Sequence, residues 1–136
     1  MTSRSAPPFR VIDASAVVEL LLAGERASAV EQSIVDAELA APDSISPEVL
    51  QAIRGLERSG EVDRDRAEEM LANFLTMPIA RVPTVSLMTD AWALRNNFTA
   101  YDACYVALAR RLGSELITAD HRLARAPNPG VPLILI

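Results

Sequence analysis

The sequence contains no lysine, a single cysteine and few aromatic residues. One cysteine, Cys104, excludes an internal disulfide and a cysteine-based zinc site, so we expect it to be a small buried apolar side chain. Aromatic residues make up 4% of the chain whereas half of all residues are hydrophobic, so the core must be built from aliphatic side chains. All 13 basic residues are arginines, and we draw no functional conclusion from this.

Long hydrophobic runs are also missing, which excludes a membrane-spanning segment. The longest candidate, residues 11–22, is interrupted by Asp13 and Glu19. Residues 1–8 lack the apolar segment of a secretion signal, so we expect a flexible N-terminal tail followed by a single domain at residues 9–136. A cytoplasmic protein without membrane contact is the resulting expectation.

Short apolar segments alternate with amphipathic segments along the chain. We expect strands at residues 9–13, 39–42, 78–83, 115–118 and 133–136, and helices at residues 14–22, 25–36, 47–59, 62–76, 85–95, 100–113 and 120–124. Gly24 should stop the first helix, and Ser46 should cap the third with Pro47 behind it. The alternation predicts an α/β fold with a mostly parallel sheet and helices on both faces.

The segment from Ala103 to Ala109 is apolar on nearly all sides, which predicts a buried helix. Its first turn carries Asp102, an acid that a buried element should exclude unless something pairs with it. Thr99 and Asp102 also have the spacing of a capping box. Asp102 therefore has two candidate roles, as a helix cap and as a ligand.

Four acids stand at the ends of predicted elements. Asp13 and Asp120 follow strands, Glu48 begins a helix just after a strand, and Asp102 heads the buried helix. Because sites in open parallel sheets form beyond the carboxyl ends of the strands, the four are expected to share one cleft. Carboxylates without histidine or cysteine suit Mg²⁺ or Mn²⁺. Such ions hydrolyse phosphate esters by activating a water, so no protein nucleophile is needed.

Each acid also has an ordinary structural role open to it. An acid in the first turn of a helix stabilises the helix by about 0.3–1 kcal/mol, and Asp13 and Asp120 have the positions of plain N-caps. For any one acid alone, capping is the commoner role. Capping does not require that several acids follow strands at the same end of one sheet.

Four sequence blocks follow one another along the chain: VIDASAVV at 11–18, PEVLQAIR at 47–54, TAYDACYVALA at 99–109 and LITADHRL at 116–123. In this order they resemble the blocks of PIN-domain proteins and, more narrowly, of the VapC toxins of bacterial toxin–antitoxin pairs. The resemblance covers residues 9–136. It implies a three-layer α/β/α fold with a parallel five-stranded sheet, and a metal-dependent endoribonuclease that acts through an Mg²⁺- or Mn²⁺-activated water.

The same resemblance assigns roles to individual positions. It assigns a catalytic, metal-binding role to four acids: Asp13, Glu48, Asp102 and Asp120. Ser15 and Thr118 fall on hydroxyl positions that orient the acids or contact the substrate. The implied partners are RNA, a second copy of the chain in a homodimer, and a small VapB-like antitoxin whose tail enters the cleft.

The chain is acidic, with a net charge of -5, which is unusual for a nucleic-acid binder. If the four acids are left out of the count, the chain has 14 acidic and 13 basic side chains, so its charge is nearly balanced. Metal ions would offset most of the negative charge of the cleft. The remaining acidity suits an antitoxin tail rich in Arg or Lys. His121 is expected to be a solvated surface residue. Six arginines near the blocks are either phosphate contacts or surface residues: Arg10, Arg54, Arg95, Arg110, Arg111 and Arg122.

Other functions fit the same residues. A PIN-like binding module without nuclease activity would hold RNA or a protein and need not take up metal at the acids. A metal-dependent nuclease acting on DNA, or a metal phosphatase, would use the same ligands. An α/β domain whose acids are only caps would tolerate Asp→Asn changes with little loss.

Overall fold

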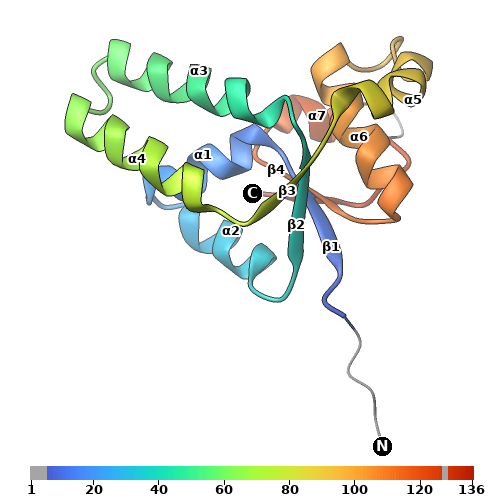
Figure 1. Cartoon of the computed structure of the whole chain (residues 1–136), viewed down its shortest axis with the longest axis horizontal. Helices are drawn as coiled ribbons and strands as arrows, with labels where there is room; N and C mark the ends of the chain where they lie inside the picture. Colours follow the sequence, from blue (N-terminus) through green and yellow to red (C-terminus); the bar gives the residue numbers. More distant parts are fainter. Residues whose placement is uncertain (1–5, 127–128) are drawn as a thin grey trace, which may run out of the picture.

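A five-stranded sheet runs through the middle of the computed structural model, which describes residues 6–126 and 129–136 (Figure 1). Its strands are β1 (Phe9–Ile12), β2 (Glu38–Pro42), β3 (Ile79–Val82), β4 (Leu116–Thr118) and β5 (Leu133–Leu135). They lie in the order β3-β2-β1-β4-β5, and every neighbouring pair is parallel. The predicted α/β fold with a five-stranded, mostly parallel sheet is confirmed.

Helices cover both faces of this sheet and complete three layers (Figure 1). One group comprises α1 (Ala14–Leu22), α2 (Ala27–Ile34), α3 (Ile45–Arg58) and α4 (Arg64–Thr76). The other comprises the 3₁₀ helix η1 (Thr84–Leu87), α5 (Met88–Ala93) and α6 (Ala100–Leu112). The short helix α7 (His121–Arg125) contacts β4 and β5, and the α3–α4 hairpin projects away from the sheet (Figure 1).

The central strands β1 and β4 bring two distant parts of the chain together. Val11 and Ile12 of β1 lie beside Leu116 and Ile117 of β4, and all four side chains are fully buried. Strands covered on both faces require such continuous apolar runs. The pairing sets the ends of β1 and β4 side by side, which positions the residues that follow each strand.

Helix α6 packs against β1 and β2 as the buried helix that the sequence predicts. Its residues from 103 to 109 are buried with one exception, Cys104, which is half-buried. The expectation of a buried Cys104 is therefore wrong, because its side of the helix opens on a hollow. At the start of α6, Thr99 Oγ1 accepts a hydrogen bond from Asp102 N at 3.2 Å, as the capping spacing predicts.

The first helix spans residues 14–22 as predicted, but the residue that ends it differs from the prediction. Ala23, not Gly24, adopts the left-handed conformation, with φ of 55°, and its N–H donates to Leu20 O at 3.2 Å. The hydrogen bond of the last turn thus places the left-handed residue at Ala23, although glycine is the residue that usually takes this position. The consequence is an alanine in a conformation that favours glycine.

Other helix boundaries also differ from the prediction: α2 is two residues shorter at each end, α4 begins two residues later and α3 begins two residues earlier. Helix α3 begins at Ile45, so Ser46 is not its N-cap, and Ser46 Oγ instead accepts a hydrogen bond from Arg81 Nε at 3.1 Å. The chain turns into this helix directly after β2, where Asp43 N still donates to Val82 O at 2.8 Å. The single helix expected at 85–95 is divided into η1 and α5.

The predicted tail at residues 1–8 falls mostly outside the described residues and stays a prediction. Residues 6–8 are exposed, and Pro8 O accepts a hydrogen bond from Glu38 N at 2.9 Å, which extends the contact between β1 and β2. Throughout residues 6–126 and 129–136, every helix is too short or too polar to cross a membrane.

Candidate active site

Asp13 lies at the carboxyl end of the central strand, where its N–H donates to Ile117 O at 3.0 Å. Its side chain is buried, with 6% of the residue exposed. Oδ1 accepts hydrogen bonds from Ser15 Oγ at 2.6 Å and from Ala16 N at 3.1 Å, and Oδ2 accepts one from Thr118 Oγ1 at 2.5 Å. Asp13 therefore caps α1 and is also fixed by two hydroxyl groups.

Those two hydroxyls join the ends of β1 and β4. Ser15 Oγ lies 3.4 Å from Thr118 Oγ1 and accepts a hydrogen bond from Ala119 N at 2.9 Å. Thr118 Oγ1 accepts a hydrogen bond from Asp120 N at 2.9 Å. Each hydroxyl thus donates to the buried carboxylate and accepts from the backbone after β4. This geometry fits the predicted orienting role of Ser15 and Thr118.

Glu48 lies in the first turn of α3 and faces α6. Tyr105 OH donates to its Oε2 at 2.8 Å. Its other oxygen, Oε1, is buried and, like Ser44 Oγ, makes no hydrogen bond of regular geometry in the described part of the chain, although Ser44 is near enough to act to lower the pKa of Glu48. An unpaired buried carboxylate oxygen is unfavourable unless a cation or a water completes it. Sequence reasoning missed Tyr105, although its spacing of three residues from Asp102 places both on one side of α6.

Glu48 and Asp102 line one hollow of about 540 Å³, which we call the acidic hollow. Its lining residues are Pro47, Glu48, Gln51, Thr99, Tyr101, Asp102 and Arg122. Asp120 lies beside it as the N-cap of α7, where its Oδ1 accepts from Arg122 N at 2.9 Å. The Arg122 guanidinium pairs with both oxygens of Asp120, with Nε 3.4 Å from Oδ1 and Nη2 3.2 Å from Oδ2.

The electrostatics separate three of the acids from the fourth. Burial raises the pKa of Asp13, Glu48 and Asp102, and repulsion from neighbouring acids adds to it in each case. For Asp102 the repelling neighbour is Asp120. Burial also acts to raise the pKa of Asp120, but the hydrogen bonds and charge of Arg122 outweigh it and leave that pKa below its ordinary value.

The acids fit a hard divalent cation by their chemistry. Asp13, Glu48 and Asp102 offer only oxygen atoms, their charges repel one another, and Glu48 Oε1 lacks a donor. Within residues 6–126 and 129–136, no three acidic, histidine or cysteine side chains form a closed metal-binding group. The structure thus brings the predicted acids within electrostatic reach of one another without the spacing of a complete ligand shell, and their role as ligands stays a prediction.

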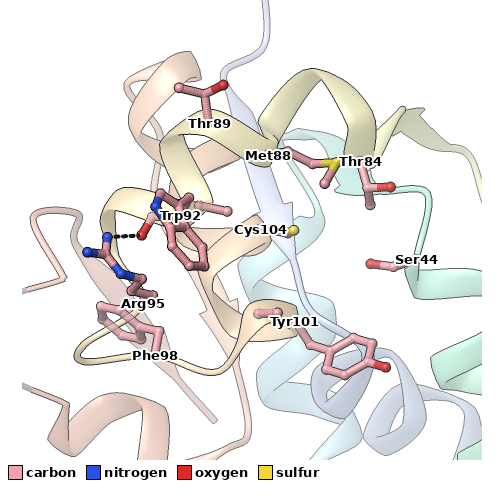
Figure 2. Close-up of a pocket in the computed structure, with 11 residues that line it drawn as sticks. Ser44, Thr84, Met88, Thr89, Trp92, Arg95, Phe98, Tyr101 and Cys104 are labelled. Atoms are coloured by element: carbon pink, nitrogen blue, oxygen red, sulfur yellow. Dashed lines mark hydrogen bonds between the residues drawn. The ribbon is translucent and has the colours of Figure 1, made fainter.

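A larger hollow of about 800 Å³ is lined by residues that include Tyr101, Trp92 and Arg95 (Figure 2). Tyr101 also lines the acidic hollow, so the two hollows adjoin. The Arg95 guanidinium lies over the Trp92 ring, 4.4 Å from its centroid, and Nη1 donates to Trp92 O at 3.0 Å. None of the four acids lines this hollow. Its lining is mostly apolar and holds none of the predicted acids, so the predicted chemistry is assigned to the smaller hollow.

Of the six arginines near the sequence blocks, Arg122 alone lines the acidic hollow. Arg10 pairs with Asp36 at 2.8 Å and with Glu115 at 3.4 Å. Arg111 donates to Ser86 O and pairs with Asp90 at 3.4 Å. His121 is exposed, as expected.

The PIN domain family model matches residues 10–129. This chain belongs to the PIN-domain family. Ribonuclease VapC3 of Mycobacterium tuberculosis is 36% identical to this PIN domain over 126 residues, which cover 91% of the chain and 92% of the relative. That similarity confirms the narrower resemblance to VapC proteins.

Solved structures share the fold of this PIN domain. VapBC2 from Rickettsia felis, bound to a DNA fragment from its promoter, has a TM-score of 0.65 at 13% identity, with 93% of this chain and 98% of that chain covered. A toxin–antitoxin complex from Klebsiella pneumoniae has a TM-score of 0.58 at 15% identity, with 92% and 95% covered. At these identities the likeness concerns the fold.

Proposed function

We propose that this PIN domain is a divalent-metal-dependent endoribonuclease and the toxin of a toxin–antitoxin pair. The observation that carries the proposal is the buried Asp13, held by two hydroxyls at the carboxyl end of the central strand, within electrostatic reach of Glu48 and Asp102. Its support from similarity is a ribonuclease that is 36% identical over 91% of the chain.

The chain's own residues prepare the site for a phosphodiester. Ser15 and Thr118 hold the Asp13 carboxylate, and Tyr105 holds one oxygen of Glu48 while the other stays unpaired. Asp13, Glu48 and Asp102 would hold Mg²⁺ or Mn²⁺, with Asp120 as a further carboxylate. When bound, the ion supplies charge stabilisation at the phosphate and lowers the pKa of the attacking water. Water then adds across a P–O bond of RNA, and no covalent protein intermediate is needed.

The proposal includes two protein partners. The acidic hollow and the net charge of -5 favour an antitoxin with a basic tail. The Klebsiella pneumoniae neighbour, described as a toxin–antitoxin complex, supports the same kind of partner. A homodimer follows from the family resemblance, and sedimentation of the purified chain would test it.

The test is cleavage of cellular RNA by purified protein with Mg²⁺, with Mn²⁺ and with EDTA, followed by sequencing of the RNA ends. We expect Asp13→Asn and Asp102→Asn to lose cleavage while circular dichroism shows an unchanged fold. Asp63→Asn is the matched control, because Asp63 caps α4 in the same way, at 2.8 Å from Arg66 N, but is exposed whereas Asp13 is buried.

Three results would contradict the proposal. One is wild-type protein that cuts no RNA with either metal. Another is full activity in Asp13→Asn and Asp102→Asn, which would leave the acids as caps only. Single-stranded DNA of matched sequence, tested in parallel, would identify a DNA nuclease if it is cut in place of RNA.

A further inference from the structure

Arg122 is the one cation among the residues that line the acidic hollow. Its guanidinium reaches back to the carboxylate of Asp120 with two nitrogens, at 3.4 Å and 3.2 Å. Its side chain is 81% exposed, whereas that of Asp120 is 21% exposed. The arginine therefore lies at the mouth of the hollow and covers the fourth acid from the solvent side.

This contact gives Asp120 a different electrostatic state from the other three acids. Burial and repulsion from Asp120 raise the pKa of Asp102, and the positive charge of Arg122 offsets part of this effect. Arg122 thus already neutralises part of the negative charge that would attract a cation. A metal ion that takes Asp120 as a ligand competes with this guanidinium, which already contacts both carboxylate oxygens.

From this geometry we propose that Arg122 is a positioning residue that competes with the metal ion for Asp120. Metal binding at Asp120 releases the guanidinium into the mouth of the hollow, where it contacts a phosphate of the entering RNA. The contact between Arg122 and an RNA phosphate rests on the proposed ribonuclease function. The competition between Arg122 and the metal ion for Asp120 does not depend on RNA.

Physical chemistry favours such an exchange. An exposed Arg–Asp pair contributes little stability, so a divalent ion can displace it at small cost. The planar guanidinium offers paired donors that match phosphate as well as carboxylate. Because the Arg122 side chain is largely solvent-exposed, it can turn from one partner to the other without repacking the core.

The first test is Mn²⁺ binding to the purified full chain without RNA, measured by isothermal titration calorimetry. Arg122→Gln should bind Mn²⁺ about two- to fivefold more tightly than the wild type, the range expected for loss of an exposed ion pair. Arg125→Gln is the matched control, because Arg125 is an exposed residue of the same helix that does not line the hollow. In an Asp120→Asn background, Arg122→Gln should change the affinity less than about twofold.

The second test separates positioning from general stability. At saturating Mn²⁺, Arg122→Gln should raise KM for RNA about fivefold with little change in kcat, and Arg122→Lys should restore part of the loss because it keeps the charge. A purely structural arginine would not give tighter metal binding together with weaker RNA binding.

Equal Mn²⁺ affinities in wild type, Arg122→Gln and Arg125→Gln would overturn the role of Arg122 while leaving a metal-dependent ribonuclease intact. An equal effect of Arg122→Gln with and without Asp120 would also overturn it. Failure of both wild type and Arg122→Gln to bind Mn²⁺ would contradict this proposal and the metal dependence of the proposed function together.

Discussion

Tyr105 donates its hydroxyl hydrogen to Glu48 Oε2 at 2.8 Å, across 57 positions of the sequence. Burial of Tyr105, together with the neighbouring Glu48 charge, raises its pKa far above the ordinary value, so the phenol remains a donor. One oxygen of Glu48 is thereby fixed, and the other is left unpaired. The site depends on this contact between α6 and the first turn of α3.

Tyr105→Phe tests that dependence. Removal of the hydroxyl leaves a half-buried carboxylate without its donor, so the free energy of unfolding should fall by about 1–2 kcal/mol. Mn²⁺ affinity should fall about tenfold, since a residue that orients a ligand is lost. Urea denaturation and calorimetry measure the two effects. Tyr101→Phe is the control, because Tyr101 is 64% exposed and should change stability by less than about 0.5 kcal/mol.

Asp13→Asn should separate stability from activity. Asparagine is as good an N-cap as aspartate, so the hydrogen bond from Ala16 N is retained while a buried charge is removed. We expect the free energy of unfolding in EDTA to rise by about 1 kcal/mol. The rate of RNA cleavage should fall more than about 100-fold, which exceeds the loss of activity typical when a residue that only orients a metal ligand is changed. A variant that is both less stable and active would contradict this assignment.

The raised pKa values of Asp13, Glu48 and Asp102 predict a pH dependence of stability without metal. In the folded state these groups bind protons at pH values where the unfolded chain has released them. The free energy of unfolding should therefore fall as pH rises from about 4, the ordinary carboxyl pKa, through the raised values, and then level off.

Denaturation in urea between pH 4 and pH 8 would measure this slope, with EDTA and with Mn²⁺ as the two conditions. Mn²⁺ favours the ionised carboxylates, so it should flatten the slope. Asp120, whose pKa is lowered, contributes stability that is lost only as pH falls below about 4. A stability that rises between pH 5 and pH 7 in EDTA would show that the acids are not destabilised by burial.

Ala23→Gly should stabilise the protein by about 0.5–1 kcal/mol. Ala23 has a φ of 55°, where an alanine side chain is strained and glycine is not, and this relief exceeds the entropy that glycine adds to the unfolded chain. Gly24→Ala is the matched control, because a Cβ at Gly24 meets no atom within 4 Å and its φ is not positive. The control should be neutral or slightly stabilising, and a destabilised Ala23→Gly would contradict the assignment of strain.

Hydrophobic periodicity sufficed to predict the five strands, their alternation with helices and the buried helix α6. A parallel sheet is covered by helices on both faces, so its strands are short continuous apolar runs that can be recognised in the sequence. The acids at Asp13 and Asp120 could be singled out because each follows a strand within two residues. The residue that ends α1 and the residue that caps α3 were predicted wrongly as Gly24 and Ser46, since hydrogen bonds of the surrounding turns outweighed residue preferences there.

Side-chain partners were the part of the site that the sequence did not reveal. The contact of Tyr105 with Glu48 depends on how α6 lies across α3, and no local pattern records that packing. The pairing of Arg122 with Asp120 spans only two residues, yet many arginines near acids remain solvated. Geometry was needed to distinguish Arg122 from the other five arginines near the sequence blocks.

The hydrogen bond between Asp13 and Thr118 joins residues that are 105 positions apart. Because β1 and β4 are neighbours in the sheet, this contact forms only when the two strands come together. Local unfolding that separates β4 from β1 would remove one of the two hydroxyls that hold the Asp13 carboxylate. The orientation of this acid therefore depends on the fold of the whole domain and not on any single segment.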